Sequence, residues 1–294
     1  MRSAVIRSHT GSYPSDTAFH IAILIPAILL CAFTLIYPAL LALHTSLAGP
    51  GGTVSLNYYS RVVTDKLFLA SLTRTIIFAA IAVFLEFVLG FAMALLMVMP
   101  LRGRSFFRTS LLVPWVLPPA VIGLAWRWIF YEDYGIVNDL ILRMGIAESP
   151  IPFLRQPHWA FATVVFTDMW KTAPFVAIIL LAGLSVIPQE LYEAAAIDGA
   201  GRVRRFSLIT LPMLTPYILT ALLFRSVHTL GIFDLVWVLT GGGPSSSTEM
   251  LSLYITKQTF RFLNVGYGAA LSVTMFVITI AVAVIFSFLS RRRF

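Results

Sequence analysis

The sequence predicts an all-α integral membrane protein with six transmembrane helices. Of its 294 residues, 59% are hydrophobic and 12% are charged, which is about half the charged fraction of soluble domains. Several apolar runs reach the roughly 20 residues that a helix needs to cross a bilayer. Because a lone helix satisfies its own backbone hydrogen bonds in lipid, each of these runs is interpreted as a helix.

Six stretches are long and apolar enough to be these helices, and they fill most of the chain. The first and the last contain no charged residue, whereas the second contains Glu86 and the third carries Arg127 near one end. The third also contains Pro114, Pro118 and Pro119, which should bend it because proline lacks a backbone donor. The predicted spans are residues 21–43, 76–99, 106–129, 159–186, 211–231 and 265–289.

The chain has room for one membrane domain, residues 21–289, and for no sizeable soluble one. We expect the first span to be retained, because it is longer than a typical signal core and no clear small-x-small cleavage site follows it. The single cysteine, Cys31, lies inside this span and excludes an internal disulfide. Residues 1–20 then form an N-terminal segment and residues 290–294 a tail.

The distribution of arginine and lysine predicts which side of the membrane each loop faces. If the N-terminus is cytoplasmic, the segments on that side are residues 1–20, 100–110, 187–210 and 290–294. They hold 11 basic and 4 acidic residues, whereas the opposite loops hold 7 of each. The positive-inside rule therefore places both termini in the cytoplasm. The net charge of +8 belongs to this rim, which argues against a nucleic-acid partner.

Between the fourth and fifth spans lies a polar, alanine-rich stretch that is typical of a short surface helix. Pro188 suits the first helical position, Glu190 falls in the first turn, and residues 194–196 are alanines, the strongest helix formers. Gly199 is placed to end the helix in a left-handed conformation. A plain amphipathic connector resting on lipid headgroups is the alternative, since three arginines follow closely.

The spacing within this stretch resembles the EAA motif of the permeases of ATP-binding-cassette (ABC) importers. The matching positions are Glu193, Ala194, Ala195, Gly199, Ile209, Leu211 and Pro212. In that family the segment is a cytoplasmic coupling helix, which docks in a cleft of the ATP-hydrolysing subunit. The resemblance therefore implies that residues 188–212 form an EAA coupling loop, on the side that the charge distribution assigns to the cytoplasm.

The resemblance extends over nearly the whole chain and indicates the carbohydrate-uptake branch of the family. The stretches that carry it are LIYPALLALHTSL (35–47), RGRSFFRTSLLVPWVLPPAVIGLAWRWIF (102–130), DMWKTAPF (168–175) and FRSVHTLGIFDLVWVLTGGGP (224–244). The TGGGP turn is similar to the half represented by the larger membrane subunit of the maltose importer. The two extra N-terminal spans and the large external domain of that subunit have no counterpart here.

The resemblance also implies a bacterial inner-membrane complex. The expected partners are a homologous second permease, two copies of an ABC ATPase subunit, an extracytoplasmic substrate-binding protein and the lipid bilayer. ATP and Mg belong to the ATPase, so this chain should need no cofactor.

The chain itself lacks the signatures of an enzyme. None of its three lysines follows a glycine, so a G-x-x-x-x-G-K-[ST] phosphate loop is absent. The histidines and the cysteine lack metal-ligand spacing, and we find no nucleophile–base constellation. We therefore expect neither a metal site nor catalysis in this chain.

Polar residues inside the spans are candidates for the substrate pathway, because burying them in a membrane is costly. They form one stripe on the fourth span and one on the fifth, namely Asp168, Lys171, Thr172, Phe175, Arg225, His228 and Thr229. At about 1.5 Å per residue, Asp168 and Lys171 lie roughly 14–18 Å below the outer end, near the midplane. The resemblance implies that counterparts of these seven positions line the sugar pocket of the maltose importer. The alternative is that Asp168 and Lys171 neutralise each other and lock helices together.

Other residues at membrane depth receive structural interpretations. Glu86 is expected to hydrogen-bond to a neighbouring helix. Trp126, Trp128 and Trp170 are able to stack on a sugar ring, but the first two fit an interfacial belt better.

The sequence therefore predicts the permease subunit of an ATP-driven, binding-protein-dependent importer for a sugar or polyol. Import of glycerol 3-phosphate or another anionic carbohydrate is an alternative, because Lys171 and Arg225 place two cations in the pathway. The EAA spacing disfavours an ion-coupled secondary transporter and an integral-membrane enzyme, since neither needs a docking helix for an ATPase.

The predicted topology is testable by cysteine labelling from each side of the membrane. A cysteine at Ser246 should react with an impermeant reagent added outside, and a cysteine at Ser290 should not, because the charge count puts them on opposite sides. Labelling of both positions from the same side would contradict the orientation and the cytoplasmic location of the coupling loop.

Overall fold

The computed structural model describes residues 16–49, 53–99 and 103–291. Most of the predicted N-terminal segment (residues 1–15) and most of the predicted tail (residues 292–294) lie outside the described residues, as do residues 50–52 and 100–102.

The described secondary structure is helical apart from one isolated antiparallel bridge between Ala48 and Val54. Three short π-helical turns among the described residues, named η here, interrupt or join the helices. In chain order the elements are α1 (Asp16–Cys31), η1 (Ala32–Ile36), α2 (Tyr37–Leu47), α3 (Asn57–Thr64), α4 (Lys66–Val98), α5 (Arg104–Val116), α6 (Pro119–Ile129), α7 (Ile136–Arg143), α8 (Pro157–Val186), α9 (Gln189–Ile197), α10 (Arg202–Arg205), η3 (Phe206–Thr210), α11 (Leu211–Leu230), α12 (Asp234–Leu239), α13 (Leu251–Thr256), η4 (Lys257–Arg261) and α14 (Val265–Arg291).

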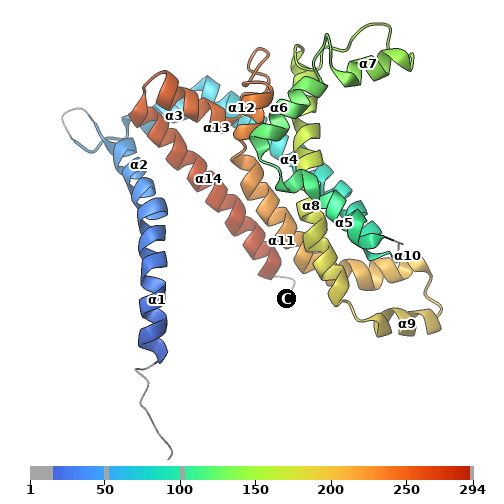
Figure 1. Ribbon diagram of the computed structural model, residues 1–294. Helices are drawn as coiled ribbons and strands as arrows, with labels where there is room; N and C mark the ends of the chain where they lie inside the picture. The colour runs from blue at the N-terminus through green and yellow to red at the C-terminus, as the bar shows by residue number, and fades with distance from the viewer. Residues whose placement is uncertain (1–15, 50–52, 100–102, 292–294) are drawn as a thin grey trace, which may run out of the picture.

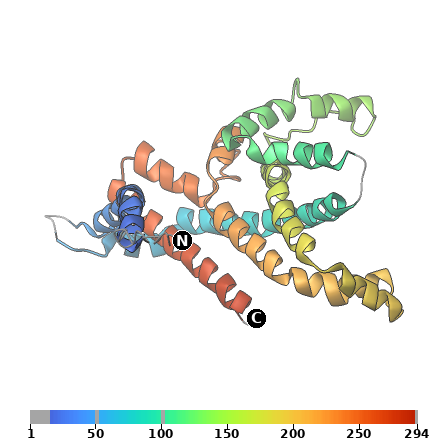
Figure 2. The same ribbon diagram turned by 60° about the horizontal axis from the view of Figure 1, so that its bottom comes forward.

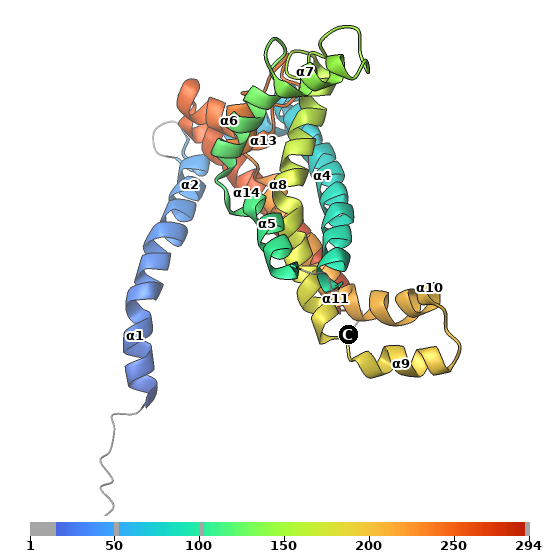
Figure 3. The ribbon, with the colours of Figure 1, turned by 45° about the vertical axis from the view of Figure 1, so that its right-hand side comes forward.

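The long helices run between two ends of the molecule (Figure 1). One end carries α9 and α10, together with the beginning of α1 and the end of α14; the other carries α3, α6, α7, α12 and α13. We call them the α9 end and the α7 end. Figure 3 shows α9 and α10 projecting beyond the rest of the bundle.

Among the residues that the structure describes, five helices are long and apolar enough to cross a membrane, and α5 with α6 makes a sixth span if the bent pair is counted as one. The expected all-α membrane fold is thus confirmed. The five are Ile23–Leu47, Lys66–Val98, Pro157–Val186, Arg202–Leu230 and Val265–Leu289. The second begins at Lys66, before the predicted span 76–99, and the Asp65 carboxylate caps it there, accepting from the backbone N–H of Leu67 (2.9 Å) and Phe68 (3.3 Å).

The first helix stands apart from the bundle over most of its length. Its apolar side chains are exposed, including Leu29 (63%), Phe33 (70%) and Leu35 (68%). Only its last part, α2, packs closely against another membrane helix, α14, among the described residues. Seen nearly end-on in Figure 2, it lies beside the beginning of α14 and away from α5 to α8. The surface that it presents is therefore available to lipid or to another subunit.

The third span is not one continuous helix, which corrects the expectation of a single bent span. Its two halves, α5 and α6, meet at 98°. Leu117 and Pro118 each precede a proline. Both of these residues have extended backbones, with ψ of 141° for Leu117 and 138° for Pro118. A residue before proline is driven out of the helical region by contact with the proline ring. Two consecutive prolines therefore turn the predicted bend into a break.

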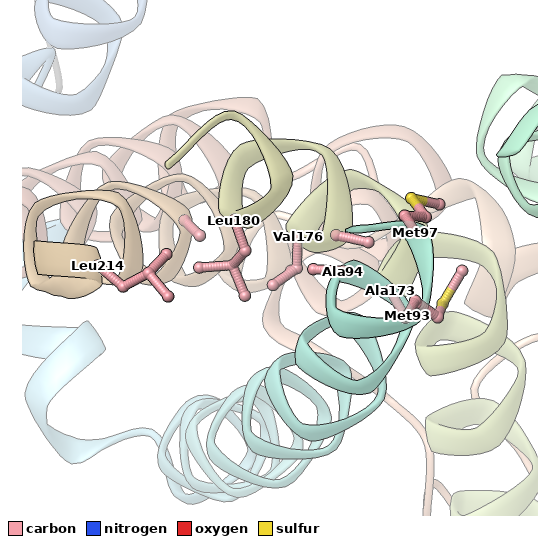
Figure 4. Packing of buried hydrophobic residues seen from close by; sticks show 9 residues of the cluster. Met93, Ala94, Met97, Ala173, Val176, Leu180 and Leu214 are labelled. Carbon is pink, nitrogen blue, oxygen red and sulfur yellow. The ribbon is translucent and has the colours of Figure 1, made fainter. Parts of the chain in front are cut away.

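One of the buried apolar clusters of the bundle is formed by α4, α8 and α11 (Figure 4). Its buried residues are Met93, Ala94, Met97, Ala173, Val176, Ala177, Leu180, Leu214 and Ala221. Small residues let α4 and α8 approach closely: a Cβ at Gly90 would lie 2.7 Å from the carbonyl oxygen of Ala173. Such small-residue contacts are a common way for membrane helices to pack, because lipid gives them no hydrophobic driving force.

At the α7 end, Asp65 joins three helices. Its Oδ2 accepts hydrogen bonds at 2.5 Å from the hydroxyls of Tyr254 on α13 and Tyr267 on α14. Burial alone would raise the pKa of Asp65, but these hydroxyls and the two capped N–H groups lower it below its usual value. Burial and the bond to Asp65 raise the pKa of Tyr254 to about 12. At neutral pH the carboxylate is therefore charged and both phenols are able to donate.

Candidate functional site

Three ionisable side chains meet where α4, α8 and α11 pack together. Arg225 on α11 forms a two-pronged ion pair with Glu86 on α4, with Nε–Oε2 at 2.6 Å and Nη2–Oε1 at 2.8 Å. The same Nη2 donates to Asp168 Oδ2 at 3.3 Å and to Thr229 Oγ1 at 2.9 Å. Glu86, Asp168 and Arg225 are at most 5% exposed. Pairing and hydrogen bonding of this kind offset the free-energy cost of removing the charges from water.

The structure gives Asp168 a different partner from the one that its helical spacing indicated. Asp168 pairs with Arg225, and within the described residues it makes no ion pair with Lys171. The Lys171 ammonium instead donates to the backbone carbonyl of Trp115 at the end of α5, at 3.4 Å. The alternative of mutual neutralisation therefore takes another form, in which Arg225 rather than Lys171 balances the carboxylates.

Beside this network lies a hollow of about 260 Å³. Trp115, Phe175 and Phe224 supply its aromatic wall: Trp115 stacks on Phe175 with ring centroids 5.7 Å apart, and Phe224 meets Phe175 edge-on at 6.4 Å. Its polar side is formed by Lys171, Thr172, Arg225 and His228. Trp115 and Phe224 are 41% and 56% exposed, so the hollow opens on a face of the bundle.

A second, smaller hollow of about 100 Å³ adjoins the first. It shares Lys171, Thr172 and His228 with the larger hollow and is otherwise lined by Asp168, by Pro119 and by residues 231–235. These residues lie nearer the α7 end, because α8 runs from that end and α11 runs towards it. The three shared side chains therefore separate two spaces that succeed each other along the bundle.

Six of the seven candidate pathway residues line one of the two hollows, and one does not. Lys171, Thr172, Phe175, Arg225 and His228 line the larger hollow and Asp168 the smaller, whereas buried Thr229 lines neither and bonds to Arg225. Sequence reasoning missed Trp115 and Phe224 as lining residues. Both lie close to residues that the sequence did single out, since Trp115 is three residues before Pro118 and Phe224 directly precedes Arg225. Glu86 bonds to another helix, as expected.

Two of the three tryptophans at membrane depth are held by other rings. Trp126 packs against Phe130, Phe166 and Trp170, with centroids 5.2–5.3 Å apart. Trp128 is 68% exposed beside Tyr134 near the α7 end. Trp126 and Trp170 therefore belong to a structural cluster, and Trp128 has the position of an interfacial residue.

The candidate coupling segment is a helix closed by a glycine turn. Gly199 adopts φ of 76°, and the N–H groups of Gly199 and Ala200 bond to the carbonyls of Ala196 (3.1 Å) and Ala195 (2.9 Å). These two bonds form a Schellman motif, for which glycine is favoured because it lacks a Cβ. The predicted left-handed terminator is thus confirmed.

The other candidate coupling residues lie on α9 and at the start of the fifth span. Glu193, Ala194, Leu211 and Pro212 are exposed, and Ala195 and Ile209 are partly buried. Tyr192 ties α9 to the following segment, because its hydroxyl bonds to Thr210 Oγ1 at 2.8 Å and its carbonyl accepts from Arg205 at 3.5 Å. The segment is therefore an exposed but braced projection.

Comparison with known proteins identifies the family to which the chain belongs. Residues 86–294 match the family described as "Binding-protein-dependent transport system inner membrane component". The chain belongs to this family. It is therefore a multi-pass inner-membrane permease of an ABC importer and is not itself the ATPase, which rules out the secondary transporter and the membrane enzyme.

Individual relatives cover most of this permease. It is 38% identical over 278 residues to the sulfoquinovosyl glycerol transport system permease protein SmoG of Agrobacterium fabrum, covering 92% of this chain and 90% of the relative. It is 38% identical over 243 residues to the trehalose/maltose transport system permease protein MalF of Thermococcus litoralis, covering 82% and 80%.

A solved structure shares the fold. In the crystal structure of a bacterial alginate ABC transporter in complex with an alginate pentasaccharide-bound periplasmic protein, one chain superposes with a TM-score of 0.82 at 22% identity. The match covers 94% of this permease and 95% of that chain.

The ion network predicts an unequal pattern of destabilisation. Arg225→Met should lower the stability of the purified permease complex by about 3–5 kcal/mol, because it leaves two buried carboxylates unpaired. Glu86→Gln should cost less, since Asp168 and Thr229 remain as acceptors. The double variant Glu86→Leu/Arg225→Met should recover part of the loss. Thermal unfolding followed by size-exclusion chromatography measures each variant.

The matched control is the exposed ion pair between Asp139 and Arg143, whose side chains are 51% and 76% exposed. Arg143→Met removes the same charge and should cost at most about 1 kcal/mol. Equal losses for Arg225→Met and Arg143→Met would show that the buried network does not hold the helices together.

Proposed function

We propose that this permease carries a sugar or polyol through the 260 Å³ hollow between α5, α8 and α11. The observation that supports the proposal is the chemistry of the wall, which joins a stacked aromatic pair to Lys171, Thr172 and His228. A sugar has an apolar ring face and many hydroxyls, so it needs an aromatic plate and a few placed donors and acceptors. Ligand pockets generally combine these two elements.

The names of relatives support the same class of cargo. SmoG is named for sulfoquinovosyl glycerol and MalF for trehalose and maltose. The two relatives have the same sequence identity to this permease, 38%. Their names therefore support a carbohydrate cargo without favouring one carbohydrate over another.

An anionic carbohydrate, such as glycerol 3-phosphate, is the second candidate, and one observation favours it. Within the described residues, the Lys171 ammonium has no carboxylate within ion-pair distance and contacts a backbone carbonyl instead. Arg225 adds less to this argument, because Glu86 and Asp168 already balance its charge.

The proposed complex contains a second, homologous permease, two ATPase copies and an extracytoplasmic binding protein. The hollow opens on a face of the bundle, so a second permease facing it would close the passage. The α9 end would be cytoplasmic, with both termini, in keeping with the arginines of that end. On the α9 projection, Ile197 and Val203 are 87% and 83% exposed, which suits a surface that docks on another protein.

The proposed role of the larger hollow can be tested by measuring the uptake of labelled sugars. Phe175→Ala and His228→Ala should each lower uptake of labelled trehalose or maltose at least several-fold, because one removes the aromatic plate and the other a polar group beside it. The control is Phe276→Ala, which removes the same ring from a 61% exposed position on α14. Parental uptake in both hollow variants would place the passage elsewhere. Uptake of glycerol 3-phosphate in preference to either sugar would favour the anionic candidate.

The proposed role of the coupling segment can be tested by measuring how much ATPase copurifies with the permease. Gly199→Val should distort the turn, because β-branched residues resist positive φ, and Glu193→Lys should reverse a charge on the docking face. Both variants should reach the membrane but retain less ATPase and lose uptake. Gly145→Val is the matched control, since Gly145 has φ of 67° in an open turn at the α7 end. Full ATPase retention with normal uptake in both test variants would rule out the coupling role.

A further inference from the structure

The break in the third span leaves one particular backbone carbonyl without a helical donor. In a helix, the carbonyl of Trp115 would accept from the N–H of residue 119, or of residue 118 in a tighter turn. Both positions are proline, which has no N–H. An unpaired backbone group in a membrane costs several kcal/mol by general estimates, so another donor is required there.

Lys171 supplies that donor. Its ammonium lies 3.4 Å from the Trp115 carbonyl oxygen, although the two residues belong to different helices. The contact also has a favourable charge, because α5 ends at Val116 and the C-terminal end of a helix carries partial negative charge. The stacking of Trp115 on Phe175, at 5.7 Å, joins the same two helices beside it.

The same ammonium borders both hollows. Lys171 lines the larger hollow with Trp115, the penultimate residue of α5, and the smaller one with Pro119, the first residue of α6. It therefore lies between the two halves of the broken span. Its bond to the carbonyl is longer than the 2.9–3.0 Å typical of such bonds, so a better acceptor in the hollow is able to draw the ammonium away.

We propose that Lys171 is a positioning residue that caps α5 at its break, and that a cargo oxygen in the larger hollow competes with the Trp115 carbonyl for its ammonium. Loading the hollow then loosens α5 from α8 and changes the angle between α5 and α6. The capping role stands on the contacts alone, whereas the competition rests on the proposed function of the hollow. Through Lys171, the broken span responds to whether the hollow is occupied.

The capping role is testable without cargo by measuring the angle between the half-helices. Spin labels at Val113 on α5 and Val121 on α6, which are 52% and 54% exposed, report their separation in the assembled importer, with Cys31→Ser to remove the native thiol. Lys171→Met should shift or broaden the distance distribution, and Lys171→Arg should preserve it, because a guanidinium is still able to donate. A Lys171→Met distribution identical to that of the parent would overturn the cap.

A second variant keeps this test independent of general damage by Lys171→Met. Pro118→Ala/Pro119→Ala restores the backbone N–H groups that would serve the Trp115 carbonyl in a helix, and it removes the proline that keeps Leu117 extended. If Lys171 acts as the cap, Lys171→Met should change the distribution much less in the Pro118→Ala/Pro119→Ala background than in the parent. An equally large change in both backgrounds would mean that Lys171 acts through something other than this carbonyl.

The competition is tested by adding trehalose, maltose or glycerol 3-phosphate at millimolar concentration to the labelled importer. A compound that the parent transports should move its distribution towards that of Lys171→Met and leave the distribution of Lys171→Met unchanged. If the parent transports one of the three and none alters the distribution, the competition is overturned. If the parent transports none of them, the proposed cargo class fails, and the cargo-free measurement still decides the cap.

Discussion

A buried arginine remains charged and presents five N–H donors in a rigid plane, and Arg225 governs how α4, α8 and α11 meet. Two of its nitrogens reach acceptors on all three helices: Glu86 on α4, Asp168 on α8 and Thr229 on α11 itself. The apolar packing between these helices tolerates small slides, whereas a two-pronged ion pair at 2.6 and 2.8 Å does not. A slide of one helix along another would leave a charge unpaired away from water, so the network sets the register.

This arrangement divides the polar residues of the membrane interior into a structural set and a set facing the hollow. The guanidinium of Arg225 is engaged by two carboxylates, and the remaining cation, Lys171, lies on the side of the larger hollow with Thr172 and His228. Counted together with Lys171, the two acids and two bases balance in number, so these four side chains need no counter-ion from cargo. Cargo entering the proposed passage would meet the Lys171 ammonium and an aromatic pair within a set of charges that is balanced overall, which suits hydroxyl-rich molecules.

The sequence predicted the elements of this site better than their pairing. Apolar length located the membrane helices, and the EAA spacing located Gly199, whose left-handed turn follows from local chemistry. The partner of Asp168 was not predictable, because spacing along one helix brings Lys171 near it but carries no information about the rotation of α11. The prolines predicted a bend but not 98°, since the angle depends on both extended residues and on the packing of α6 against α12. Trp115 was overlooked for the same reason, because it reaches the hollow only through that break.

Two of the three helices that wall the hollow, α8 and α11, also lead from it to the projection at the α9 end. α8 continues to Val186, directly before α9, and the helix Arg202–Leu230 runs without a break from α10 to the residues beside the hollow. Leu211 and Arg225 are 14 residues apart, or about 21 Å along a helix. The bonds of Tyr192 to Thr210 and Arg205 fasten α9 to the second of these helices. α9 is therefore joined to α8 through the chain and to the helix that carries α11 through these side chains, so the proposed coupling segment has a direct connection to two walls of the hollow.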